Sequence, residues 1–573
     1  MSNDQIPSTV ITKLSIRNIL LEESTLQNHL DAQNNNYQEY LANLYLLFFE
    51  YNIELTILKL AKILTIALIR NDKGLSKFLL SNDRYELPVI LKTCELLDSR
   101  RKHDQINKKT EKINDPKKLA KHKAVLANLL ALNEGVEMRL TSSKIKFLKE
   151  NWINNLSKER LEFMALLFPT KHWKWLIDLM HLKPSDFKLE WFTKYIFTSE
   201  YLPGSIVDLS IQINQDNILA VLNKYNLPYT YLRVKHKELL TNEVKEFIAK
   251  YTELSDIIRY WKEFNITQNV FMNFSQRVDN GESINMPYGE LVKRIQMFKE
   301  EDNINDATQM LIYKLLINAE HKLTDYKINI ESPVVVLGDA SPSMDIAIKT
   351  SSIIASMLVK LCNAKLHLFR DTDEAIENPP KTVNEVLNAM TIFKSGGSTA
   401  PAASLYPYYK KKEVVKTFIL VTDEEENCGY VDDTHKNNAW SYSSDKENYF
   451  ASLFKKYREE IYPAKLVFVS FLRNNKDGQM VKHLKELIPD IEKDIIQFIL
   501  NSQKPDLRKL DSLLNKLTME TDTNNSKFKD LLEFINTGNN NNLYNIEDIH
   551  NVLSGKFLIN VDEEFDGVMT ITI

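Results

Sequence analysis

Residues 334–343, VVVLGDASPS, set a run of apolar and mostly β-branched residues directly before three oxygen-bearing side chains, those of Asp339, Ser341 and Ser343. The chain continues with SMDIAIKTSSIIASMLVKLC (343–362) and AKLHLF (364–369), which change from helical to extended periodicity. The order strand, helix, strand is typical of a parallel sheet with helical connections. This stretch therefore predicts an α/β domain that begins near residue 331.

The remainder of the chain repeats this alternation. Because helices separate successive strands, we expect a doubly wound domain over 331–573, with ligand sites in the loops at the carboxyl ends of its strands. The last segment, 556–573, is predicted to be β-type. Further strands are predicted in VVKTFILVTD (414–423), AKLVFVSFL (464–472) and DIIQFIL (494–500), and helices near 382–390, 398–409, 446–461, 478–488, 505–517 and 526–535.

Residues 37–330 carry a helical pattern without a clear strand. Apolar residues recur at spacings of three and four, as in ELTILKLAKILTIALI (54–69), and prolines stand at expected helix boundaries. No fixed repeat length is found, so the pattern predicts an α-solenoid or an irregular helical array. The predicted organisation is an N-terminal extension (1–36), a helical region (37–330) and an α/β domain (331–573), which together make an α plus α/β protein.

The bulk composition is that of a globular protein without a membrane anchor. Of the 573 residues 43% are hydrophobic and 26% are charged, and the formal charge is −4, so the chain has no strong overall field toward nucleic acid. The three cysteines form no disulfide framework or metal knuckle. The N-terminus lacks a signal-peptide pattern, and no apolar stretch is long enough to span a membrane. We therefore expect a cytoplasmic protein.

One segment of the helical region is strongly basic. Residues 100–123 hold ten Lys or Arg residues but only three acidic ones. Such a segment is either a solvated loop and helix face or a surface that contacts the phosphates of a nucleic acid. The candidate phosphate-contacting residues are Arg100, Arg101, Lys102, Lys108, Lys109, Lys112, Lys117 and Lys118.

Three separate pieces of the α/β domain carry candidate metal ligands. Asp339, Ser341 and Ser343 follow one predicted strand, Thr399 follows the glycine pair of FKSGGST (393–399), and Asp423 ends another strand. If these loops meet at one sheet edge, their hard oxygen atoms suit Mg²⁺ or Mn²⁺. The simpler alternative for the first piece is a helix N-cap. For the acidic run 424–426 the simplest interpretation is a solvated helix start.

The five residues resemble the metal-ion-dependent adhesion site of von Willebrand A domains at every motif position. The resemblance implies direct ligation by Ser341 and Ser343, ligation by Thr399 either directly or through water, and ligation through water by Asp339 and Asp423. It also implies an open coordination position that a carboxylate from a protein partner fills.

The layout of the whole chain resembles the Ro autoantigen family with its TROVE module. The residues that carry this likeness are MPYGELVKRIQMF (286–298), GGST (396–399) and ILVTDEEE (419–426). The resemblance implies a ring of HEAT-like helix pairs that binds structured or small noncoding RNA. It adds an RNA partner to the protein partner expected at the metal site.

These observations favour a non-enzymatic binding protein. The sequence lacks a phosphate loop, a His-Glu-x-x-His pair, a nucleophile elbow and the kinase motifs. Asp371 and Asp373 are interpreted as loop residues. Two alternatives to RNA binding stay open, namely a metal-dependent protein-interaction scaffold without a nucleic-acid role, and a subunit that works with an ATPase.

Overall fold

A computed structural model of the chain divides into two compact units, Met1–Asn217 with Asn524–Ile573, and Ile218–Thr523. The segment 556–573, predicted to be β-type, lies outside the described residues. The residues that the structure describes are 15–21, 24–51, 53, 55–133, 135–264, 268–301, 304–326, 328–388, 396–431, 445–473, 478–521, 526–537 and 543–555.

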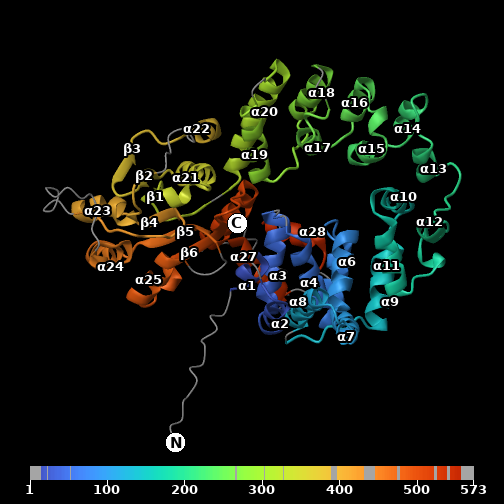
Figure 1. Ribbon diagram of the computed structural model, residues 1–573, viewed down its shortest axis with the longest axis horizontal. Coiled ribbons are helices and arrows are strands. Elements are labelled where there is room, and N and C mark those ends of the chain that lie inside the picture. The colour runs from blue at the N-terminus through green and yellow to red at the C-terminus, as the bar shows by residue number, and fades with distance from the viewer. Residues whose placement is uncertain are drawn as a thin grey trace, which may run out of the picture. The chain divides into compact units, whose positions relative to one another are not determined.

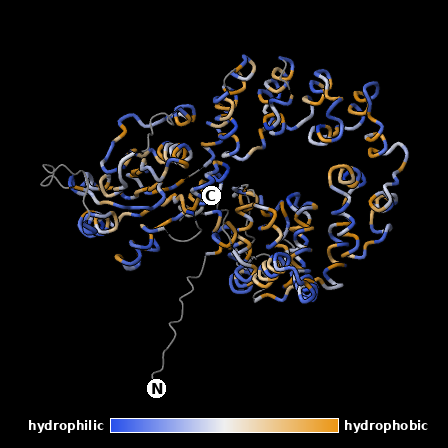
Figure 2. Tube along the Cα trace, in the orientation of Figure 1, coloured by the Kyte–Doolittle hydropathy of each residue, from blue (hydrophilic) through white to orange (hydrophobic). Residues whose placement is uncertain are grey.

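In its described residues the first unit consists of helices, most of which carry hydrophobic residues on one side and hydrophilic residues on the other (Figures 1 and 2). Side chains of Thr25 and Thr141 cap the starts of two of them by accepting backbone N–H groups. The helices are α1 (Ile16–Leu21), α2 (Leu26–Asn35), α3 (Tyr37–Tyr45), α4 (Ile57–Ile69), α5 (Lys73–Ser81), α6 (Leu87–Leu97), α7 (Ser99–Thr110), α8 (Pro116–Asn133), α9 (Ser142–Asn151), α10 (Lys158–Leu167), α11 (Thr170–Met180), α12 (Phe192–Thr198), α13 (Ile206–Ile211), α27 (Ser526–Thr537) and α28 (Ile546–Leu553).

The two ends of the chain contribute to the same core in this unit. Helix α27 packs against α3, and the Tyr45 hydroxyl donates to the Leu543 carbonyl at 2.6 Å. The hydroxyls of Tyr37 and Tyr544 lie 2.8 Å apart. Helices α1 and α2, which precede residue 37, also bury apolar side chains such as Leu26. The helical structure thus begins before the predicted start at residue 37.

The second unit begins with a further array of helices. Within it, α14, α16, α18 and α20 pack each against the next, and α19 packs against α20. The Asp511 carboxylate accepts the backbone N–H groups of Tyr288 and Gly289 at the start of α19, at 2.6 and 2.7 Å. The helices are α14 (Ile218–Lys224), α15 (Tyr229–Lys235), α16 (Asn242–Ala249), α17 (Leu254–Arg259), α18 (Gln268–Asp279), α19 (Tyr288–Lys299), α20 (Asp306–Thr324) and α26 (Leu510–Thr521).

The same unit contains a six-stranded sheet in the order β3-β2-β1-β4-β5-β6. All neighbouring strands are parallel except β2 and β3, which are antiparallel. Asp373, predicted to lie in a loop, instead begins the edge strand β3, where its carboxylate contacts the His367 ring at 2.8 Å. The strands are β1 (Val334–Asp339), β2 (Lys365–Phe369), β3 (Asp373–Ile376), β4 (Thr417–Thr422), β5 (Lys465–Leu472) and β6 (Ile495–Asn501).

Helices cover both faces of this sheet (Figure 1). Val335 and Leu337 of β1 share a buried cluster with residues of the helices on one face, whereas α21 packs on β1 from the other. The chain is therefore helical in its N-terminal region and doubly wound α/β in its C-terminal region, as predicted. The helices of this region are α21 (Ile348–Cys362), α23 (Pro401–Lys411), α24 (Phe450–Glu460), α25 (Gln479–Leu487) and α22 (Val383–Asn388), which packs on α20 and α21.

The predicted domain bounds at 36 and 330 mark changes in the type of secondary structure, whereas the compact units reflect packing, so those bounds stay predictions. Among the helices of the described residues, none combines the length and the apolarity that a membrane crossing requires.

Candidate metal centre

The carboxyl ends of β1 and β4 meet where the strand order reverses direction, which is where doubly wound sheets place their ligands. Asp339 is the last residue of β1 and is 1% exposed. Its Oδ1 accepts the Ser341 N–H at 2.9 Å, and the hydroxyls of Ser341 and Ser343 lie 3.0 Å apart. Ser343 is exposed, so this oxygen cluster opens to solvent.

The loop that carries Thr399 lies against both neighbouring loops. The Gly396 N–H donates to the Ala340 carbonyl at 3.0 Å, which joins it to the first loop. Gly397 has a φ of +75°, which explains the glycine at that position. The Thr399 N–H donates to the Asn427 side chain at 2.9 Å, and the Asn427 N–H donates back to the Thr399 carbonyl at 3.2 Å. Thr399 itself is buried just before α23.

Asp423 follows β4 directly, and the preceding residue, Thr422, links its loop to Asp339 by a hydrogen bond. The Thr422 hydroxyl donates to Asp339 Oδ2 at 2.6 Å and accepts the Glu424 N–H at 3.0 Å. Asp423 Oδ1 accepts the Glu425 N–H at 3.0 Å. Thr422 and Asn427 were not singled out from the sequence, although the string Thr-Asp at a strand end was the available signal.

The two carboxylates of this edge are buried near each other. Burial, and secondarily the charge of Asp423, raise the pKa of Asp339 to about 7. Within the described part of the chain, no ion pair joins Asp339 or Asp423 to a basic side chain. Two buried acidic groups without a basic partner form a site whose electrostatics favour a cation.

The donor set fits a small hard cation. Two neighbouring ligands of an octahedral ion at ~2.1 Å lie roughly 3.0 Å apart, which matches the 3.0 Å between the Ser341 and Ser343 hydroxyls. Among the described residues, no three His, Cys, Asp or Glu side chains gather around a common point. This edge therefore offers mainly hydroxyl ligands with two carboxylates, which suits Mg²⁺ or Mn²⁺ better than Zn²⁺.

The acidic run after Asp423 was wrongly interpreted as a solvated helix start. Residues 423–428 form no helix, and of the three glutamates 424–426 only Glu425 is exposed. Glu424 is fully buried with a φ of +61°, and its carboxylate accepts the side chains of Ser470 and Gln497 and the Val481 N–H. The left-handed turn at Glu424 directs its side chain to β5, β6 and α25, where burial leaves it in a polar network.

Glu426 is buried in a different environment. Its Oε1 accepts the Phe450 N–H at 2.7 Å at the start of α24. Burial raises the pKa of Glu426 to about 8. Glu426 therefore reinforces a helix start while it is held in an apolar region that disfavours its charged form.

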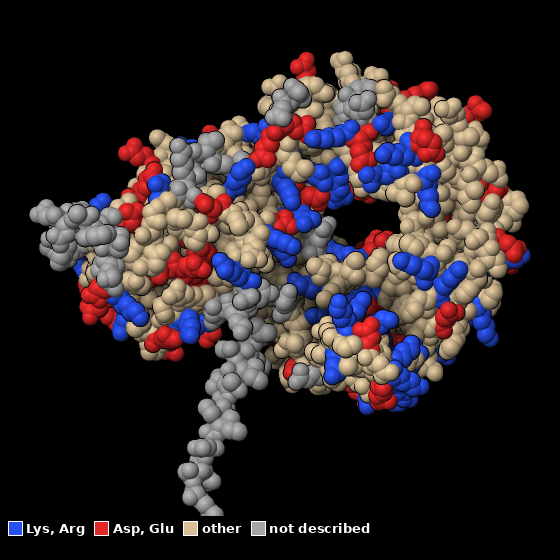
Figure 3. Space-filling model, viewed as in Figure 1, with Lys and Arg blue, Asp and Glu red and all other residues tan. Residues whose placement is uncertain are grey.

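The basic segment forms the helical hairpin of α7 and α8, over which Lys and Arg side chains gather (Figure 3). Three of its cations are paired, Arg100 with Glu137, Arg101 with Asp98 and Lys102 with Glu95. The other members are exposed and form no ion pair in the part of the chain that the structure describes, namely Lys108, Lys109, Lys112, Lys117, Lys118, Lys121 and Lys123.

The tryptophans that follow the basic segment in the sequence differ in their exposure to solvent. Trp152 and Trp173 stack in the core with ring centroids 6.3 Å apart, whereas Trp175 is 38% exposed. The first two are therefore unable to stack on a ligand.

No protein-family model matches the chain, and no curated protein sequence matches it significantly. Among solved structures, the chain is similar to the Ro (RSR) protein of Deinococcus radiodurans with 12% identity and a TM-score of 0.47. That alignment covers 85% of this chain and 94% of the Deinococcus chain.

Proposed function

We propose that the edge formed by Asp339, Ser341, Ser343, Thr399 and Asp423 binds one Mg²⁺ or Mn²⁺ ion and, through it, a carboxylate of a protein partner. The observation that carries the proposal is the pair of buried carboxylates without a basic partner beside two hydroxyls 3.0 Å apart. In this arrangement Ser341 and Ser343 bind the ion directly. Thr399 binds it directly or through water, and Asp339 and Asp423 bind it through water.

A carboxylate partner follows from the charge balance of this site. Hydroxyl ligands carry no charge, so a cation that they hold keeps much of its attraction for an incoming anionic oxygen. Ser343 lies on the exposed side of the cluster, and the nearby Ile346 side chain is 69% exposed. An exposed apolar residue beside an open metal position is suited to contact with another protein.

The first test is a Mn²⁺ titration followed by electron paramagnetic resonance. We expect one Mn²⁺ per chain, displaced by Mg²⁺, and a loss of affinity of about 100-fold when Ser341→Ala and Ser343→Ala are combined. The matched control is Ser283→Ala, an exposed serine of the same unit. Addition of a Glu-containing peptide should lower the water relaxation enhancement of the bound Mn²⁺, because the carboxylate displaces a coordinated water. Equal Mn²⁺ affinity in the wild type and the double variant would refute the site.

We further propose that the hairpin of α7 and α8 contacts RNA through phosphates. This second function is carried by the seven exposed lysines that form no ion pair within the described residues. Lysines that are not neutralised by acidic neighbours release counterions when they meet a phosphate backbone. The proposal specifies no base sequence, since phosphate contacts alone carry none.

RNA binding by the hairpin is testable by filter binding of a structured RNA at several salt concentrations. Charge reversal at Lys108, Lys109, Lys117 and Lys118 should weaken binding at least tenfold and reduce the slope of log affinity against log salt by up to roughly 3 to 4. The matched control reverses four exposed lysines elsewhere, Lys171, Lys188, Lys235 and Lys237. If both quadruple variants bind like the wild type, the hairpin does not contact RNA.

A further inference from the structure

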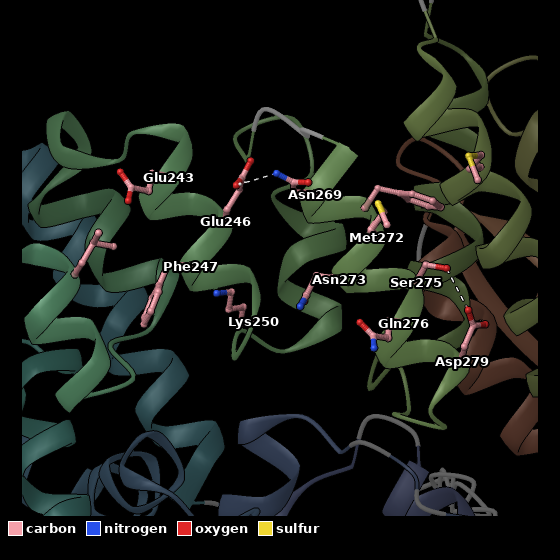
Figure 4. Close-up of a pocket in the computed structure, with 13 residues that line it drawn as sticks. Glu243, Glu246, Phe247, Lys250, Asn269, Met272, Asn273, Ser275, Gln276 and Asp279 are labelled. Carbon is pink, nitrogen blue, oxygen red and sulfur yellow. Dashed lines mark hydrogen bonds between the residues drawn. The ribbon is translucent and has the colours of Figure 1, made fainter.

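An open groove with a volume of about 890 Å³ crosses the helical array of the second unit. Most of the residues that line it belong to α16 and α18. Leu219 of α14 and Met310 of α20 complete the lining. Figure 4 shows Glu246 and Lys250 on the side of α16 that faces Asn269 and Asn273 of α18. Because α14, α16, α18 and α20 pack in succession, the groove runs across the helices rather than along one of them.

A row of amide side chains follows one side of α18. Asn269, Asn273 and Gln276 are spaced by four and three residues, which places them on the same helix face. Asn269 Nδ2 donates to Glu246 at 3.2 Å, whereas Asn273 Oδ1 is buried without a hydrogen-bond partner. An amide carries both a donor and an acceptor, as a peptide unit does, so a row of amides suits the backbone of an extended chain.

The charges of the groove favour a cationic ligand over a polyanion. Glu243 and Glu246 line it together with a single basic side chain, that of Lys250. A third acidic residue, Asp279, is paired with Lys314 outside the lining. Because Lys314 balances Asp279, the charge of the groove is set by Glu243, Glu246 and Lys250, which together are net negative and attract cationic side chains more than phosphates.

Exposed apolar side chains continue the groove onto α20. Met272 is 59% exposed and Met310 is 55% exposed. On α20, Tyr313 and Ile317 follow Met310 at three and seven residues and are 65% and 41% exposed. This spacing makes one apolar stripe on the helix. An exposed stripe that adjoins a groove is typical of a surface that another chain covers, and methionine adapts to varied partners.

From these observations we propose that the groove binds an extended segment of a partner protein that carries Lys or Arg side chains together with apolar ones. The amide row hydrogen-bonds its backbone, Glu243 and Glu246 bind its cationic side chains, and the methionines contact its apolar side chains. Three steps between neighbouring helices cover about 27 Å, which an extended chain of roughly eight residues spans at about 3.3 Å each. This site is separate from the proposed metal centre and needs no cation.

Fluorescence anisotropy of the full chain with the labelled nonapeptide Ser-Lys-Leu-Pro-Lys-Leu-Ser-Lys-Leu tests this site. We expect the same affinity with Mg²⁺ and with EDTA, which separates the groove from the metal centre. The peptide with Glu in place of each Lys should bind at least tenfold more weakly. A version with N-methylated Leu residues should bind at least threefold more weakly, because it lacks backbone N–H donors. Equal affinity of the Lys and Glu peptides would overturn the proposal.

Variants locate the binding within the groove. Glu243→Lys combined with Glu246→Lys should weaken the Lys peptide at least tenfold, and Asn273→Ala should weaken it at least threefold. The control Glu486→Lys makes one such substitution at an exposed residue of α25, outside the groove, and should leave affinity unchanged. Unchanged affinity in the double variant, with an unaltered circular dichroism spectrum, contradicts the proposal.

Discussion

Asn in place of Asp339 is expected to make the metal-free protein more stable at pH 8 while it abolishes binding of divalent cations. The carboxylate is 1% exposed, and burial together with the charge of Asp423 raises its pKa to about 7. A shift of this size corresponds to about 4 kcal/mol of unfavourable ionisation. The lost hydrogen bond from Thr422 offsets about 1 kcal/mol, so we expect a net gain of about 2 to 3 kcal/mol in the free energy of unfolding.

The raised pKa of Asp339 determines how the free energy of unfolding changes with pH. Between the ordinary pKa of 3.8 and the raised value of about 7, the folded protein holds a proton on Asp339 that the unfolded chain has lost. The wild-type free energy of unfolding therefore falls as the pH rises through this window, and the Asn variant lacks that fall. Calorimetry in EDTA from pH 4 to 8 measures the free energy of unfolding of both proteins. Asp325→Asn, at an exposed residue, is the control. A variant that is less stable than wild type at pH 8 would contradict the expectation.

The second large effect on the free energy of unfolding is expected for Glu426→Gln. Burial raises the pKa of Glu426 to about 8, and its Oε1 accepts the Phe450 N–H. The folded state therefore holds a proton on Glu426 from the ordinary value of 4.5 up to about 8, and wild-type stability declines across that window. Glutamine keeps the acceptor but has no charge. The stability of the variant relative to wild type should thus grow with pH, by up to about 5 kcal/mol above pH 8.

Glu425→Gln is the matched control for this experiment, because Glu425 is the exposed neighbour of Glu426. It should leave the pH profile of unfolding unchanged. Glu426→Gln should also leave Mn²⁺ affinity unchanged, since Glu426 is not one of the proposed ligands. A Glu426→Gln profile parallel to wild type between pH 4.5 and 9 would show that the carboxyl ionises freely in the folded protein.

Both predictions describe acidic groups that lower the stability of the α/β region. The proposed function accounts for Asp339, because a bound cation offsets the cost of its charge. Glu424 differs, since three hydrogen-bond donors surround its carboxylate. Asp423 and Glu424 are adjacent, so the same turn presents one carboxylate to the proposed cation and fixes the other beneath the sheet edge.

The secondary structure of the α/β region could be predicted from the sequence because it is local. The runs before Asp339 and Asp423 are buried strands, as their unbroken apolar character indicated. The edge strand β3 was missed, because its residues DEAI (373–376) have no apolar run that would indicate a strand, and its pairing with β2 is not recorded in its own sequence. The three loops of the candidate site were also predicted to meet, since each follows or adjoins the carboxyl end of a strand.

What the sequence by itself determined is the type of most elements and the set of oxygen-bearing side chains available at one sheet edge, since periodicity and strand ends are local properties. Only the tertiary structure decided that Glu424 and Glu426 are buried, that Thr422 links Asp339 to the Asp423 loop, and that Asn269, Asn273 and Gln276 face a groove. The tertiary structure also joined Tyr45 to Leu543, which are 498 positions apart. The physical reason is that such contacts depend on which faces of distant elements pack together, and the spacing of residues within one element does not record its partner.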